Sequence, residues 1–532
     1  MQVRLKAAAQ MLHSLLMPHV MRLRSVRAAL AALLVLCLCA PGISAGRKKD
    51  SRKEKGAAPA ALANKIDALL AQPSASRAAW GIAIEDLNSG AAVYSYNADR
   101  LFTPASNAKL FTTATAWARL GPAYQFRTTL ESTAAPDKYG RLSGDLILVG
   151  RGDPNLSGRA LPYAGKTQRP LPPEQAFLEL ADQLVLRGVK VIDGDLVADD
   201  SFYSNERYGE GWAQNDLVWE YGTAVSALSV NDNAVFVQVK PGEKEGDRAL
   251  VTLAPAAEYF EIDNHIATVA AGERKLGLQR QMGSHHVELW GTIPLNDSGT
   301  SLAVAIDEPA EYCARLMHEL LLRRGIELHG KVRAQHAARN AGTEALAAPR
   351  VVLAEHISAP LSQDLTVINK VSQNLHAELL LRLLGHEKGT GGSVAAGLQV
   401  VKGFLPEAGI SSDEVALSDG SGLSRQDLVT PRATVKLLRY AAQQAWGADF
   451  AATLPVAGVD GTLANRLKTL PAGAVVQAKT GAVDHVNSLS GYLTTASGQR
   501  YVFAMFCNNH TFENHGATEV LDAILTAVAG AK

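Results

Sequence analysis

The chain lacks a net charge, and this absence excludes some classes of function. Its 532 residues include 52 lysines and arginines against 52 aspartates and glutamates. We expect no nucleic-acid partner, because such binding depends on a broad basic field. The length also exceeds what one compact core usually organises, so two or three domains are expected.

Cysteines are scarce as well. Two of the four lie within the first 45 residues, which leaves Cys313 and Cys507 for the rest of the chain. Cys313 falls in an expected helix over 311–324 and Cys507 in an expected strand over 501–507, in what we take to be different domains. Both are predicted to be free, buried thiols rather than a disulfide.

The N-terminus lacks an apolar run long enough to cross a bilayer as a stable anchor. Basic residues precede a short apolar stretch over 28–40, and small residues follow it at 43–45. This order is typical of an export signal. We predict a signal peptide over residues 1–45 and a periplasmic location. An uncleaved anchor is the alternative, and Met21 competes with Met1 as the start.

Lysine and arginine are dense just after the expected cleavage point. Such a stretch is usually solvated, so residues 46–59 are predicted to form a flexible basic leader. A more specific interpretation is that these basic residues make weak peripheral contact with the membrane or with anionic envelope polymers.

Three short motifs follow one another along the rest of the chain. S-x-x-K occupies Ser106–Lys109, S-x-N occupies Ser372–Asn374, and K-T-G occupies Lys479–Gly481. Each motif alone often occurs by chance, but together they form the active-site set of the penicillin-recognising serine hydrolases. Gln373 replaces the Asp of the stricter S-D-N form.

The S-x-x-K motif supplies a nucleophile and its base. Ser106 is expected to open a helix, where free N–H groups favour negative charge, and Lys109 lies on the same helix face. Burial and a second cation, for which Lys479 is the candidate, lower the pKa of Lys109 so that it can accept the Ser106 proton. Backbone N–H groups of Ser106 and Ala482 are the expected oxyanion hole.

The other two motifs are expected to handle the substrate. Ser372 can carry a proton from the lysine base to the leaving nitrogen, and Asn374 can hold that lysine and a substrate amide. Lys479 and Thr480, on a strand edge, can bind the carboxylate of a C-terminal residue. Gly481 is expected to leave room for substrate beside the strand.

Elements expected around the motifs indicate an α+β catalytic domain. Five strands are expected, two before the Ser106 helix and three near the C-terminus: 80–86, 92–96, 475–479, 487–494 and 500–507. Helices fill most of the chain between 363 and 445. An antiparallel sheet flanked by helices on both sides is therefore predicted.

A long stretch separates the first motif from the second. Roughly 200 residues of it are more than a minimal catalytic fold needs, and this is enough chain for one or two further domains. We assign residues 60–123 and 350–532 to the catalytic domain. Residues 124–349 are expected to form an inserted accessory region with two nested domains.

Further segments make the chain resemble the low-molecular-mass, class C penicillin-binding proteins, which are D-alanyl-D-alanine carboxypeptidase/endopeptidases. They are G-R-G-D-P at 150–154, S-A-L-S-V-N at 226–231, D-G-S-G-L-S-R at 419–425 and L-P-V-A-G at 454–458. The resemblance implies a β-lactamase/transpeptidase-like domain with two inserted, largely β domains. It implies an acyl-enzyme on Ser106, peptidoglycan stem peptides and muropeptides as substrates, and β-lactams as covalent inhibitors.

The resemblance also implies a pocket for the third residue of the stem peptide, a diamino acid. The matching positions are Asp216, Tyr221 and Arg425; Asp216 would pair with the ammonium end and Arg425 with the carboxylate. Ala482 stands where relatives often carry Thr or Ser, which removes one side-chain hydrogen bond to the substrate.

Features that other functions need are missing. His285, His286 and His376 lack the H-E-x-x-H spacing of a zinc site, so neither a metal nor a cofactor is expected. Two alternatives stay open. One is a serine β-lactamase, although no motif supplies the group that would activate water. The other is a non-catalytic sensor of penicillin or muropeptides.

Overall fold

The computed structural model describes residues 60–165, 169–337, 349–511 and 516–531. The expected signal peptide and basic leader lie outside the described residues. None of the helices in these ranges has the length and apolar character that crossing a bilayer requires.

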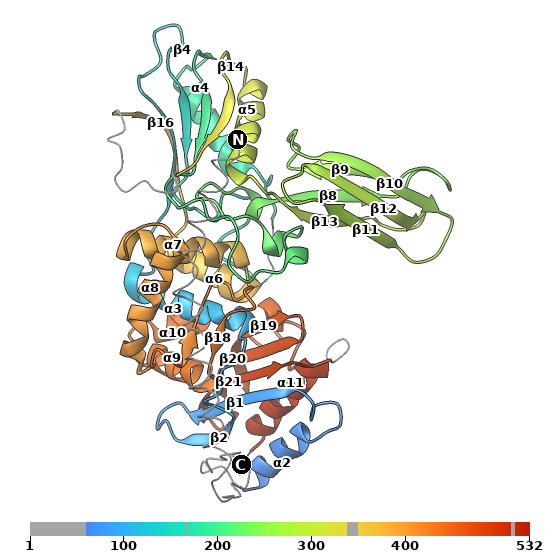
Figure 1. The fold of residues 1–532 in the computed structure, drawn as a ribbon, viewed down its shortest axis with the longest axis vertical. Helices are drawn as coiled ribbons and strands as arrows, with labels where there is room; N and C mark the ends of the chain where they lie inside the picture. The colour runs from blue at the N-terminus through green and yellow to red at the C-terminus, as the bar shows by residue number, and fades with distance from the viewer. Residues whose placement is uncertain (1–59, 166–168, 338–348, 512–515, 532) are drawn as a thin grey trace, which may run out of the picture. The chain divides into compact units, whose positions relative to one another are not determined.

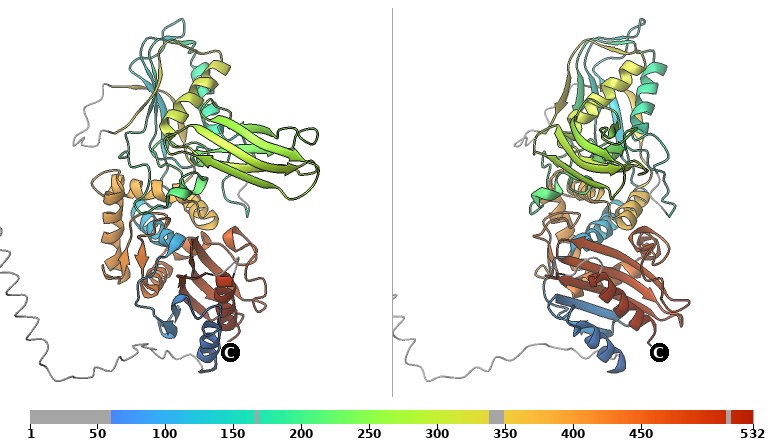
Figure 2. Two further views of the ribbon diagram at one scale, coloured as in Figure 1. Left: turned by 45° about the vertical axis from the view of Figure 1, so that its right-hand side comes forward. Right: turned by 90° about the vertical axis from the view of Figure 1, so that its right-hand side faces the viewer.

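A five-stranded antiparallel sheet organises the expected catalytic region, in the order β19-β20-β21-β1-β2. The strands are β1 (Ala79–Asp86), β2 (Ala92–Tyr96), β19 (Val475–Val483), β20 (Val486–Thr494) and β21 (Arg500–Asn508). β1 pairs with β21 along its whole length, so the first strands of the chain, blue in Figures 1 and 2, continue the red C-terminal strands. The predicted antiparallel sheet is confirmed.

Helices cover both faces of this sheet, as predicted. They are α2 (Ala60–Leu70), α3 (Ala108–Leu120), α6 (Leu361–Val371), α7 (Asn374–Lys388), α8 (Val394–Phe404), α9 (Pro431–Gln443), α10 (Gly447–Ala452) and α11 (Gly516–Ala529). Ile82 and Ile84 of β1 join the core with α2 and α11, whereas Ala83 between them joins the core with α3, α7 and α9. The period of two along a strand explains the two cores.

Three element boundaries differ from the expectations. Ser106 lies in a short 3-10 turn, η1 (Ala105–Asn107), and therefore precedes α3. The residue pattern predicts a helix over 375–384 that ends at Gly385, whereas α7 continues through this glycine to Lys388. A Cβ on Gly385 would lie 2.7 Å from the nitrogen of Gly397, so this glycine permits close packing of α8. β19 extends past the expected residue 479, so the whole K-T-G motif lies within the strand.

A mixed five-stranded sheet, in the order β15-β7-β5-β3-β16, organises part of the expected insertion. Its strands are β3 (Arg127–Ser132), β5 (Leu146–Val149), β7 (Leu196–Asp199), β15 (Val332–Gln335) and β16 (Val351–Ile357). The residue pattern predicts helices over 174–187 and 309–324, and the structure has α4 (Gln175–Leu186) and α5 (Pro309–Arg323) there, both packed into the core of this sheet. β16 pairs with β3, so residues 351–357, which we expected in the catalytic domain, belong to this sheet.

Two long strands expected here are each interrupted. The residue pattern predicts one strand over 141–149 and another over 189–198. The structure splits the first into β4 (Arg141–Leu142) and β5, and the second into β6 (Val191–Ile192) and β7. β4 and β6 form a short parallel sheet with β14 (Glu327–Leu328). A Cβ on Gly194 would lie 2.5 Å from the carbonyl carbon of Gly144, so the two breaks pack against each other.

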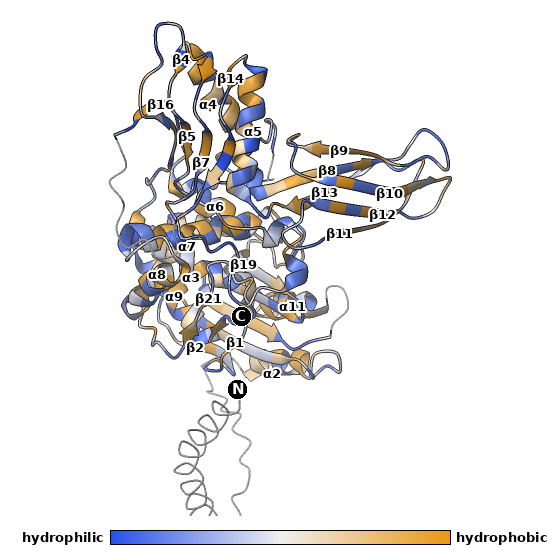
Figure 3. Cartoon of the chain, turned by 45° about the horizontal axis from the view of Figure 1, so that its top comes forward, coloured by the Kyte–Doolittle hydropathy of each residue, from blue (hydrophilic) through white to orange (hydrophobic). Residues whose placement is uncertain are grey.

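Two three-stranded sheets, β13-β8-β9 and β10-β12-β11, complete the expected insertion. Their strands are β8 (Ala234–Lys240), β9 (Leu250–Ala254), β10 (Glu261–Val269), β11 (Lys275–Arg280), β12 (His286–Pro294) and β13 (Thr300–Ala305). We did not predict β10 to β13. β10 buries few side chains completely, and hydrophilic and hydrophobic residues mix along these strands in Figure 3. Such strands give a weak periodic signal.

The two cysteines outside the N-terminal segment are free and buried, as predicted. Cys313 lies in α5 and Cys507 in β21. Burial raises the pKa of the Cys507 thiol to about 12, and that of Cys313 well above its usual range. Both thiols are therefore unreactive packing groups.

Candidate active site

The turn that carries Ser106 is fastened to the central sheet. Ala105 adopts a left-handed φ of 48°, which brings Ser106 over the end of β19. Asn107 donates hydrogen bonds to Ser488 Oγ at 2.6 Å and to the carbonyl of Lys479 at 3.3 Å. Ser488 Oγ in turn donates to the carbonyl of Pro104 at 2.6 Å. Strained backbone of this kind persists where neighbouring contacts hold it, as at many catalytic turns.

Lys109 is fully buried directly beside the serine. Its Nζ lies 2.9 Å from Ser106 Oγ, 2.6 Å from Asn374 Oδ1 and 2.6 Å from the carbonyl of Ser421. Burial lowers the pKa of Lys109 to about 7, although nearby acidic residues, Asp419 first, oppose that shift. An ammonium has three donors and all three are matched here. Loss of one proton would leave a lone pair facing Ser106.

Ser372 pairs with the K-T-G lysine. It occupies a left-handed position, with φ of 68°, between α6 and α7. Lys479 Nζ donates to Ser372 Oγ at 2.8 Å and to the carbonyl of Thr480 at 2.9 Å. We expected Ser372 to contact the S-x-x-K lysine, whereas its side-chain hydrogen bond among the described residues is with Lys479. Burial and the positive charge of Lys109 lower the pKa of Lys479.

Asn374 links the serine to the inserted region. It is the first residue of α7, and its Oδ1 accepts from Lys109. Its Nδ2 donates to the backbone carbonyl of Tyr221 at 2.8 Å. One further N–H of the amide group is left for a substrate carbonyl.

A cleft of about 450 Å³ opens over Ser106. Seven of the predicted site residues line it: Ser106, Ser372, Asn374, Ala482, Asp216, Tyr221 and Arg425. Lys109 and Lys479 are buried behind these residues, and Thr480 donates to Thr462 Oγ1 at 2.7 Å. A larger cavity of about 1140 Å³ lies against α5 and β15 and contains none of the motif residues.

Three of these residues meet at one end of the cleft although they are far apart in sequence. Tyr221 OH donates to Asp216 Oδ1 at 3.3 Å, and Arg425 Nη2 lies 3.5 Å from Asp216 Oδ2. Burial raises the pKa of Asp216, against the opposing charge of Arg425. The carboxylate, guanidinium and phenol together suit a side chain that carries charge and hydrogen-bonding groups.

Several contributors to the site carry no recognisable signal in the sequence. Asp484, in the turn after β19, lies 3.7 Å from Arg425 Nη2. Trp212 from the expected insertion donates to Asp419 Oδ2 at 2.8 Å, and Asp419 also accepts the backbone N–H of Gly422. The acceptors for Lys109 and Asn374 include main-chain carbonyls, which no residue motif can reveal.

Position 481 requires glycine for a different reason from the one we expected. A Cβ at this position would lie 2.2 Å from Ser488 Oγ and 3.0 Å from the nitrogen of Ser106. The missing side chain therefore makes room for the serine turn rather than for the substrate. Ser488 cannot give way easily, because it is hydrogen-bonded on both sides.

Replacing Gly481 by alanine should therefore displace Ser106. We expect kcat/KM to fall at least about 100-fold, because displacements near 1 Å cost this much at a reacting centre. Gly403→Ala, in α8 with open space around its Cβ position, is the control and should retain wild-type activity. Full activity in Gly481→Ala would contradict the assigned packing role.

A serine and a buried lysine at the edge of an antiparallel sheet, with a second lysine on β19, define an acyl-enzyme hydrolase of the β-lactamase/transpeptidase class. Residues 62–528 match the family described as the D-Ala-D-Ala carboxypeptidase 3 (S13) family. The chain belongs to this family of serine-type D-Ala-D-Ala carboxypeptidases, within the low-molecular-mass class C penicillin-binding proteins.

Individual relatives agree with this assignment. A D-alanyl-D-alanine carboxypeptidase from an Actinomadura species is 35% identical over 511 residues, which cover 94% of this chain and 90% of the relative. The carboxypeptidase DacB of Haemophilus influenzae is 28% identical over 437 residues, or 81% of this chain and 85% of the relative.

Solved structures agree in fold. Penicillin binding protein 4 from Haemophilus influenzae superposes with a TM-score of 0.73 at 26% identity, covering 87% of this chain and 98% of that one. A second structure of that protein, in complex with a β-lactam, has a TM-score of 0.68 at 24% identity and the same coverage.

Proposed function

We propose that this chain is an exported serine D,D-peptidase that hydrolyses the terminal D-Ala-D-Ala bond of peptidoglycan stem peptides. The observation that carries the proposal is the 2.9 Å contact between Ser106 Oγ and the fully buried Nζ of Lys109. The same site would cleave D-Ala–diamino acid cross-links, because only the group beyond the scissile bond differs. β-Lactams, which one relative binds in its solved structure, would acylate the same serine.

In the acylation step, neutral Lys109 takes the proton of Ser106 as Oγ attacks the carbonyl of the penultimate D-Ala. The N–H groups of Ser106 and Ala482 stabilise the oxyanion. Collapse of the tetrahedral intermediate breaks the C–N bond, and Ser372 passes a proton to the departing D-Ala nitrogen. Lys479 replaces that proton through its contact with Ser372. Water then attacks the ester and gives its proton to Lys479 through Ser372, while Lys109 returns its proton to Ser106 Oγ, so that both lysines and the serine regain their starting forms.

Substrate contacts are divided between the K-T-G strand behind the cleft and the end of the cleft that contains Asp216. Lys479 and Thr480 bind the carboxylate of the terminal D-Ala, whose negative charge favours the ammonium form of a lysine with a lowered pKa. Asn374 holds a substrate amide. Asp216, Tyr221 and Arg425 contact the side chain of the third residue, and their position in the same cleft supports this role.

Three parts of the proposal rest on the sequence. Residues 1–45 act as a signal peptide that directs the protein to the periplasm. The basic leader over 46–59 makes weak contact with the membrane or with envelope polymers. Residues 124–349 form two nested accessory domains within a catalytic domain of 60–123 and 350–532, with β16 as a shared boundary.

Mass spectrometry of a penicillin adduct tests the proposal. Incubation with penicillin should add one ligand mass at Ser106, located by peptide mapping, and the adduct should last for minutes or longer. The same preparation should release D-Ala from a stem pentapeptide, and Ser106→Ala should do neither. Release of the adduct within seconds would favour a β-lactamase, and acylation without D-Ala release would favour a sensor.

A further inference from the structure

Asp484 adds a second carboxylate to the end of the cleft that faces the third residue of the substrate. It is the first residue after β19, in the turn to β20, and lines the same cleft as Ser106, Asp216 and Arg425. Arg425 Nη2 lies 3.5 Å from Asp216 Oδ2 and 3.7 Å from Asp484 Oδ2. The guanidinium is therefore shared between two carboxylates.

This end of the cleft carries a net negative charge. Among the cleft-lining residues, the charged side chains are Asp216, Asp484 and Arg425, two acids against one base. Asp216 is buried and in place, whereas the Asp484 side chain is 73% exposed and sits at the mouth. The two acids interact. Burial is the main reason why the pKa of Asp216 is raised, the charge of Arg425 opposes the rise, and the charge of Asp484 adds to it.

The additional carboxylate of Asp484 should distinguish side chains that end in an ammonium alone from side chains that also carry a free carboxylate. A terminal ammonium gains from both acids. A side chain that also bears a free carboxylate needs Arg425 as its partner, but Asp484 already occupies one side of that guanidinium and repels the incoming group.

We propose that Asp484 is a specificity-determining residue and that the cleft selects stem peptides whose third residue ends in an ammonium without a free carboxylate beside it. Lysine-type residues and diamino acids with an amidated carboxylate share this chemistry. The inference rests on the proposed peptidase function and names the substrate class for it.

Three pentapeptides that differ only in the third residue test the proposal. This residue is lysine, a diamino acid with its free carboxylate, or the same diamino acid with that carboxylate amidated. We expect wild-type kcat/KM for the lysine and amidated peptides to exceed that for the free carboxylate by about five- to ten-fold, a size appropriate to a partly exposed charge pair.

Asp484→Asn should raise kcat/KM for the free-carboxylate peptide by a similar factor and lower that for the other two by no more than about two-fold. Asp216→Asn should lower kcat/KM for all three peptides. Glu245 is an exposed acid in the β8–β9 loop, and Glu245→Gln should leave all three values unchanged. An unchanged substrate ratio in Asp484→Asn, or a wild-type preference for the free carboxylate, would overturn the proposal.

A second measurement separates this inference from the proposed function. Acylation of Ser106 can be timed with two β-lactams whose side chains end in an ammonium alone or in an ammonium plus a carboxylate. Asp484→Asn should speed acylation only by the second compound. Failure of D-Ala release from every pentapeptide would defeat the peptidase function, whereas equal effects of Asp484→Asn on both β-lactams would defeat charge selection.

Discussion

Substituting Lys109 by methionine should reduce the acylation rate of Ser106 by about 10³-fold or more, near the upper range for removal of a general base. Methionine approximates the length of the lysine stem but cannot accept the proton of Ser106 Oγ, which Lys109 Nζ contacts at 2.9 Å. Stopped-flow acylation by penicillin and D-Ala release from a pentapeptide are the measurements.

Lys370 provides the matched control for loss of a buried lysine. It lies in α6, and its ammonium pairs with Asp460 at 2.6 Å. Lys370→Met should lower the unfolding temperature yet keep the acylation rate within a few-fold of wild type. Equal loss of acylation in both variants would show that Lys109 matters through folding alone.

The pH dependence of wild-type acylation gives an independent view of the same lysine. Burial lowers the pKa of Lys109 to about 7, and only the neutral amine is a base. Acylation should therefore rise with pH through about 7 and level off above it. A flat profile across this range would exclude Lys109 as the titrating base.

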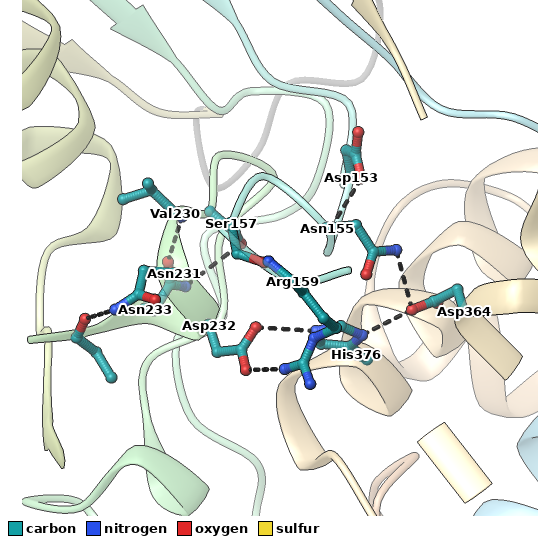
Figure 4. A network of polar contacts seen from close by, with 12 residues as sticks. Asp153, Asn155, Ser157, Arg159, Val230, Asn231, Asp232, Asn233, Asp364 and His376 are labelled. Atoms are coloured by element: carbon teal, nitrogen blue, oxygen red, sulfur yellow. Dashed lines mark hydrogen bonds and ion pairs between the residues drawn. The ribbon is translucent and has the colours of Figure 1, made fainter. Parts of the chain in front are cut away.

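The second large effect is expected from Asp232, which ties the expected insertion to the catalytic helices (Figure 4). Its Oδ2 accepts from Arg159 and Arg169, each at 2.5 Å, and its Oδ1 lies 3.1 Å from His376 Nε2. His376, in the first turn of α7, also contacts Asp364 of α6 at 2.6 Å through Nδ1. Asp232, His376, Asp364 and Arg159 are all nearly inaccessible to solvent.

Asp232→Ala should lower the free energy of unfolding by about 3–5 kcal/mol. It leaves buried cations without their shared partner, and a broken buried pair costs this much. Chemical denaturation followed by tryptophan fluorescence measures the change. Asp182→Ala, which removes the exposed partner of Arg324 in the same region, should cost less than about 1 kcal/mol. Equal costs would refute the buried network as a stabilising element.

The network should also give stability a defined pH range. Burial opposes the charged form of Asp232, but Arg159 and Arg169 outweigh it and hold the pKa well below 3.8. The contribution of Asp232 is therefore present above pH 3.8 and lost as pH falls through the folded pKa. Asp364 and Asp232 raise the pKa of His376 above 6.5 against burial, so its contribution is complete below 6.5 and lost at higher pH.

The local order of residues determined the chemistry and much of the catalytic fold. The three motifs each lie within four positions, and the strands of the central sheet show the alternation that a two-sided core requires. Sequence therefore predicted Ser106, Lys109 and Lys479 and the antiparallel sheet. Asp216, Tyr221 and Arg425 came from resemblance to a family, because nothing in their local pattern marks them.

Tertiary structure decided what depends on contacts between distant segments. Three such contacts join residues far apart in the chain. Ser372 pairs with Lys479, Asn374 donates a hydrogen bond to the Tyr221 carbonyl, and Gly481 packs against the serine turn. Periodicity reports only which side of its own element a residue faces. The depth at which Lys109 is buried, and the charge that Asp484 adds to the cleft, arise when those elements pack together.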